Sequence, residues 1–69
     1  MRDITNTVVR VNDGYANLLY QGHEHGPRAA VLTVDGDDCY ICQIDPIPTA
    51  GIEAGDRTWH SVVDMEPIA

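Results

Sequence analysis

Residues 29–45 have the sequence AAVLTVDGDDCYICQID, and we expect the rest of the chain to be organised around them. Two apolar runs, Ala29–Val34 and Cys39–Ile44, flank an acidic segment that contains Asp35-Gly36. Short runs rich in Val, Ile and Tyr around an Asp-Gly pair predict a β-hairpin. Its register stays open, although a loop of about three or five residues separates the two faces best. The side chains expected on the inner faces are Ala30, Leu32, Val34, Tyr40, Cys42 and Ile44.

A second hairpin is predicted on the N-terminal side. Residues 4–11 alternate polar and apolar, and residues 15–21 form another such run after Asp13-Gly14. If that pair is a two-residue turn, Val11 opposes Ala16 and Val9 opposes Leu18, which gives one largely apolar face. Residues 22–27, GHEHGP, then form a loop closed by proline.

A fifth strand is predicted near the C-terminus. Pro46 ends the central hairpin because proline donates no hydrogen bond, and residues 46–57 form a long loop with at most one helical turn within 52–56. Thr58–Glu66 alternates again. The inward set is Trp59, Val63 and Met65, and the outward set is Thr58, His60, Asp64 and Glu66. Five short strands predict an all-β fold, a small five-stranded antiparallel barrel or two-layer sandwich built from hairpins.

Length and charge restrict the classes of protein that fit this chain. Its 69 residues suffice for one domain, residues 1–69, with a small core. Eleven carboxylates against four arginines and no lysine give a net charge of −7, which disfavours binding to a nucleic-acid backbone or an anionic membrane. This acidic composition suggests a high-GC or halophilic source. The N-terminus has no apolar signal core, so we expect a soluble protein, intracellular or within a viral or phage particle.

The two cysteines form a Cys39-x-x-Cys42 motif, and His23 and His25 lie upstream. Two cysteines and two histidines can hold a structural zinc ion, which predicts a zinc-stabilised mini-domain as the alternative function. In an extended strand, however, Cys39 and Cys42 fall on opposite faces roughly 10 Å apart, which is wrong for chelation or a disulfide. We therefore expect no cofactor and two buried free thiols.

Catalytic machinery is not indicated, and we expect no enzyme. The spacing permits a Cys–His pair, but no oxyanion-forming loop or phosphate-binding glycine motif accompanies it. The carboxylates at Asp35, Asp37 and Asp38 are too few for a calcium loop and predict a charged, solvated turn.

The remaining hypothesis is a non-catalytic acidic β module that acts by protein–protein interaction, as an accessory subunit, particle component or inhibitor. Its partner would be another protein or a second copy. An open sheet of five strands leaves edges, and residues 4–11 or 58–66 are the expected ones. The loop at 46–57 and the strand after it are the expected contact region. The residues named for it are Ile47, Ile52, His60 and Val62.

Overall fold

The fold consists of five antiparallel strands in one sheet, which confirms the predicted all-β class. A computed structural model describes residues 4–12 and 26–68. The strands are β1 (Val8–Val11), β2 (Arg28–Asp35), β3 (Asp38–Gln43), β4 (Arg57–Ser61) and β5 (Met65–Pro67). Two 3-10 turns, η1 (Pro48–Ala50) and η2 (Val62–Asp64), lie between them. No helix among the described residues is long and apolar enough to cross a membrane.

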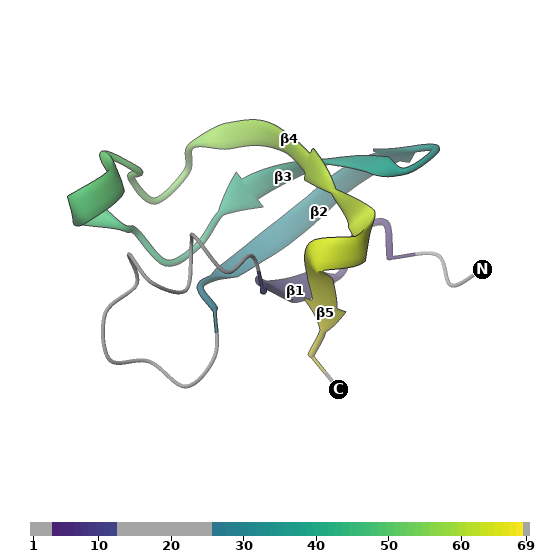
Figure 1. The fold of residues 1–69 in the computed structure, drawn as a ribbon, viewed down its shortest axis with the longest axis horizontal. Coiled ribbons are helices and arrows are strands. Elements are labelled where there is room, and N and C mark those ends of the chain that lie inside the picture. Colours follow the sequence, from purple (N-terminus) through teal and green to yellow (C-terminus); the bar gives the residue numbers. More distant parts are fainter. Residues whose placement is uncertain (1–3, 13–25, 69) are drawn as a thin grey trace.

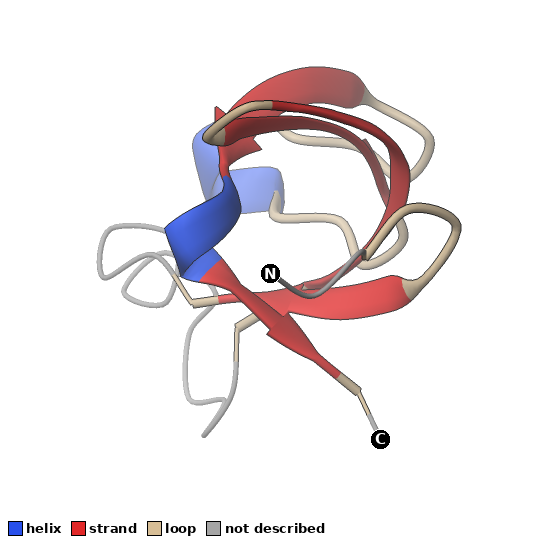
Figure 2. Ribbon diagram, turned by 90° about the vertical axis from the view of Figure 1, so that its right-hand side faces the viewer, coloured by secondary structure: helices blue, strands red, loops and turns tan. Residues whose placement is uncertain are grey.

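The sheet order is β4-β3-β2-β1-β5, so the edge strands β4 and β5 are neighbours in sequence. The sheet curls around its interior, and η2 crosses from one edge to the other (Figures 1 and 2). Backbone bonds tie this connection to both sides, from Val62 to the Asp37 carbonyl at 2.9 Å and from Asn12 to the Asp64 carbonyl at 2.7 Å. Within the described residues β4 and β5 do not pair, and the sheet is therefore coiled but not closed.

Strand β1 is shorter and more central than the sequence predicts. Residues 4–7 form a turn in which Asn6 has a φ of 64°, and only Val8–Val11 are extended. Strands β2 and β5 occupy the two hydrogen-bonding sides of β1, so residues 4–11 do not form an edge. The predicted partner of β1, residues 15–21, lies outside the described residues.

The central hairpin is confirmed, but its loop is tighter than expected. Asp35 pairs with Asp38, which leaves the two-residue turn Gly36-Asp37. Gly36 has a φ of 61°, and Asp37 is not among the described residues with positive φ. Glycine at the first position and a negative φ at the second is the type II′ arrangement, which matches the twist of paired strands.

The inner face of this hairpin is the opposite of the predicted one. Ala29, Val31, Cys39 and Ile41 are buried, while Leu32 is exposed. The register shifts between Val31 and Thr33 because Leu32 has no partner on β3. Such a β-bulge inserts one residue, and it reverses the alternation, so that Val34 packs on the core from the same side as Val31.

The predicted fifth strand is two strands. Residues 58–66 divide into β4, η2 and β5, and this one segment supplies both edges of the sheet. Met65 is buried as predicted, whereas Trp59 and Val63 are exposed. Val62 packs against the core instead of facing outward. The core combines residues of every strand but β4, together with Ile4. It comprises Ile4, Val9, Val11, Ala29, Val31, Cys39, Ile41 and Met65.

Candidate interaction surface

The outer face of β2, β3 and β4 carries most of the exposed apolar side chains of the sheet. Since Val31, Cys39 and Ile41 point inward, alternation places Ala30, Tyr40, Cys42 and Trp59 on the outer side. The bulged Leu32 is exposed beside them, as is Val8, which pairs with Ala30 from β1. We call Val8, Ala30, Leu32, Tyr40, Cys42 and Trp59 the outer apolar face.

Trp59 and Tyr40 form the aromatic centre of this face. They are direct cross-strand partners, and their ring centroids lie 5.2 Å apart with the planes tilted by 44°. Trp59 remains 52% exposed although it is the largest side chain in the protein. Tilted aromatic pairs stabilise a sheet by roughly 0.5–1.5 kcal/mol beyond their buried area. The pair thus holds the indole in place on a rigid strand while much of its surface faces solvent.

The charges around the outer apolar face are unusual for so acidic a chain. Alternation puts Arg10, Arg28 and Arg57 on this side of the sheet, in or next to the row that contains Cys42. Arg28 donates to both carboxylate oxygens of Asp45 at 2.9 Å, and these bonds lower the pKa of Asp45 to about 2. Arg57 forms no hydrogen bond or ion pair with a described residue. A cation with no partner among the described residues therefore lies two residues before the exposed indole.

The cysteines lie on opposite faces of β3. The buried Cys39 thiol donates to the His60 carbonyl at 3.5 Å, and the Cys42 thiol donates to the Gly55 carbonyl at 3.7 Å. Burial, with Asp38 next in the chain, raises the pKa of Cys39. Sulfurs that point to different sides of a strand do not chelate one ion, so this geometry favours free thiols. His23 and His25 lie outside the described residues, and no group of three metal-ligating side chains occurs within the part described.

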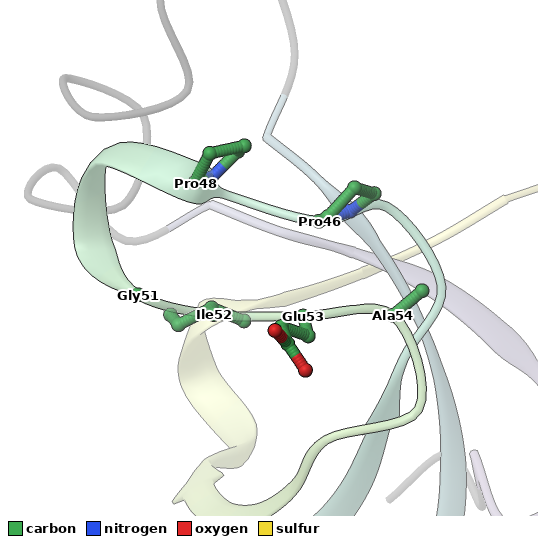
Figure 3. Close-up of a pocket in the computed structure, with 6 residues that line it drawn as sticks. All are labelled: Pro46, Pro48, Gly51, Ile52, Glu53 and Ala54. Carbon is green, nitrogen blue, oxygen red and sulfur yellow. The ribbon is translucent and has the colours of Figure 1, made fainter.

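The loop at 46–57 folds back on itself. Ile47 and Ile52 pair as an isolated bridge, and Gly51 follows η1 with a φ of 70°. An open cavity of about 340 Å³ lies on this loop, with Pro46 and Pro48 on one arm and Ile52 on the other (Figure 3). Ile47 itself is only 2% exposed. Its role as a contact residue stays a prediction, but its side chain already packs inside the protein.

His60 and Val62 are half-buried at the junction of β4 and η2. His60 Nδ1 accepts the Ser61 backbone N–H at 2.9 Å and lies 3.6 Å from Asp64 Oδ2. These contacts hold the chain where it turns from one edge of the sheet to the other. Val62 packs against the core, and the role of His60 and Val62 as contact residues stays a prediction.

Comparison of the chain with protein-family models, curated proteins and solved structures finds no match. Alternation along the sequence predicts Trp59 and Tyr40 in the interior, whereas the structure has both on the outer face. The sequence contains a local signal for the exposure of Trp59. Residues two positions apart on a strand share a face, and the residues two positions from Trp59 are Arg57 and Ser61. Polar neighbours on both sides indicate a solvent-facing tryptophan.

Proposed function

We propose that this protein is a non-catalytic β module that works by binding another protein chain through its outer apolar face. The observation that carries the proposal is the half-exposed Trp59, held against Tyr40 on a regular strand. Tryptophan, tyrosine and arginine are the side chains most enriched among residues that dominate binding energy. Trp59, Tyr40 and Arg57 supply one of each within two adjacent strands.

The surroundings of this face have the composition of a contact surface. Apolar and aromatic side chains occupy its centre, and Thr33, Arg57 and Ser61 lie around it, with Asp35 and Asp38 at the hairpin tip. An apolar centre with a polar rim is typical of protein interfaces. The net charge of −7 argues against a nucleic-acid backbone as the ligand. An accessory subunit, a particle component and an inhibitor all act in this way.

The test compares two apolar truncations. Trp59→Ser removes the proposed anchor, whereas Val63→Ser removes an apolar side chain that is 85% exposed on η2, away from the outer face. Each variant and the wild type is immobilised, partners are captured from the native host, and the affinity of the purified partner is measured by calorimetry.

We expect Trp59→Ser to weaken binding by at least tenfold, since truncation of a central aromatic costs about 2 kcal/mol or more. Val63→Ser should bind with the wild-type affinity. A partner that binds wild type and Trp59→Ser equally well would overturn the proposal, as would equal losses in both variants.

A further inference from the structure

We infer that the partner of this surface is a second copy of the chain, and that two β4 strands pair antiparallel about a two-fold axis at Trp59. The inference rests on the proposed function and names its partner. Strand β4 is an edge of the sheet, and in Figure 1 it runs along the top of the ribbon with no described segment beyond it. An unpaired strand edge is a template for another strand.

The hydrogen bonds between β3 and β4 show which backbone groups of β4 are used. Gln43 donates to the Asp56 carbonyl at 2.7 Å, and Val62 donates to the Asp37 carbonyl at 2.9 Å. Both pairs belong to the register in which Tyr40 faces Trp59. Because bonded and non-bonded pairs alternate in an antiparallel ladder, Thr58 and His60 bond to β3. Arg57, Trp59 and Ser61 therefore direct their N–H and C=O groups to the free edge.

These three residues are self-complementary. Trp59 is midway between Arg57 and Ser61, so a two-fold axis at Trp59 places Arg57 opposite Ser61 of the second copy and Trp59 opposite itself. All three outward-directed residues are then bonded in both strands. If the register between the two strands shifts by two residues in either direction, Arg57 or Ser61 has no partner within β4 of the second copy. The symmetric register thus uses every free backbone group of β4.

The side chains favour the same arrangement. The two indoles meet on the outer face, and each is flanked by the Tyr40 ring of its own copy, which extends the apolar centre across the axis. Strand β4 contains none of the eleven carboxylates of the chain, and Arg57 meets an uncharged serine. The other edge strand, β5, is a poor site for pairing with a second copy. It has only three residues, of which Glu66 is charged and Pro67 has no backbone N–H to donate.

In the monomer, neighbouring side chains form hydrogen bonds with some of the outward-directed backbone groups of β4. The Ser61 N–H donates to His60 Nδ1 at 2.9 Å, and Thr58 Oγ1 donates to the Trp59 carbonyl at 3.4 Å. Pairing exchanges these local bonds for bonds between strands. Because bonds are exchanged and not only gained, the dimer is reversible. Added salt strengthens the dimer, since it screens the repulsion between two chains that each have a net charge of −7.

The decisive variant is Ser61→Pro. Ser61 has a φ of −74°, which proline adopts, and its N–H makes no bond to β3. Proline therefore removes an outward donor and leaves the existing ladder intact. Ser61→Ala is the matched control because it removes the hydroxyl and keeps the N–H. Trp59→Thr removes the ring and keeps a residue that favours strands.

Sedimentation equilibrium of the untagged full chain under reducing conditions, over a wide concentration range and at two salt concentrations, measures the association. We expect a monomer–dimer equilibrium for wild type and Ser61→Ala that tightens with salt, and a dissociation constant at least tenfold higher for Ser61→Pro and Trp59→Thr. Circular dichroism checks that each variant is folded.

Wild type that is monomeric at every concentration overturns the inference, and Trp59-dependent capture of a different protein then still supports the proposed function. A dimer lost in Trp59→Thr but unchanged in Ser61→Pro also overturns it, because the copies then meet through their faces and not their edges. A dimer that neither variant weakens, together with no Trp59-dependent partner, rejects both the inference and the proposed function.

Discussion

The contact between Arg28 and Asp45 ties the start of β2 to the chain just after β3. The Asp45 carboxylate accepts the Arg28 backbone N–H at 3.0 Å as well as the two guanidinium bonds. The Asp45 N–H in turn donates to the Arg28 carbonyl at 3.2 Å. The perturbation that tests this contact is Asp45→Asn, which keeps the shape of the side chain and removes its charge.

The size of the effect follows from the pKa of Asp45. Hydrogen bonds from the Arg28 side chain hold that pKa at about 2, below the ordinary value of 3.8. A difference of one in pKa corresponds to about 1.4 kcal/mol, so full retention of the interaction would contribute about 2.5 kcal/mol to the free energy of unfolding. The Arg28 side chain is 47% exposed, and solvent screening reduces the expected contribution to roughly 1 kcal/mol.

The sign of the pH dependence is fixed because the pKa is lower in the folded protein than in the unfolded chain. The contribution is complete above about pH 4, where the unfolded carboxyl is ionised, and it is lost as the pH falls through about 2. Urea unfolding of wild type and Asp45→Asn should therefore differ by roughly 1 kcal/mol at pH 7 and converge near pH 2. The thermal midpoint of the variant should be about 4–8 °C lower at neutral pH.

Glu53→Gln is the control, since it removes one negative charge from the adjacent loop at a residue that has no ion pair with a described residue. We expect this variant to be as stable as wild type or slightly more stable, because it lowers the net repulsion. An Asp45→Asn deficit that stays constant from pH 7 to pH 2 would refute the electrostatic argument. So would an equal loss in both variants.

Three further predictions concern the thiols, the hairpin turn and the net charge. A thiol reagent should modify Cys42 faster than Cys39, because Cys39 is buried and its pKa is raised, and metal analysis of untagged protein should find no stoichiometric zinc. Equal rates of modification, or one bound zinc ion per chain, would contradict the strand geometry. Gly36→Ala should lower the free energy of unfolding by about 1 kcal/mol, because a φ of 61° is strained for alanine even though no atom lies within 4 Å of the added methyl group, and Gly36→Asn should lower it less. Equal stabilities of the three proteins in urea would argue against the tight turn. The thermal midpoint should rise with sodium chloride as salt screens the charge of −7, and a falling midpoint would show that ion pairs dominate.

The class of fold and the position of the central hairpin can be predicted from the sequence alone. Apolar runs on both sides of Asp35-Gly36 have the length and composition of strands, and Pro46 prevents the second from continuing. These are local properties, because strand propensity, turn chemistry and the missing proline donor act within a few residues. The extended geometry of β3 also separates Cys39 from Cys42 onto opposite faces, as the sequence predicted.

Which face of the central hairpin and of β4 is buried depends on tertiary contacts. Both faces of the central hairpin contain apolar side chains, so alternation could not choose between them, and the bulge at Leu32 reverses the alternation midway along β2. The division of residues 58–66 into two edge strands arises because the chain must cross the coiled sheet through η2, a long-range requirement with no local signal. The exposure of Trp59, in contrast, has a local signal in Arg57 and Ser61, which share its face of β4. Its face was set by pairing with Tyr40, a residue 19 positions earlier in the chain, and not by its hydrophobicity.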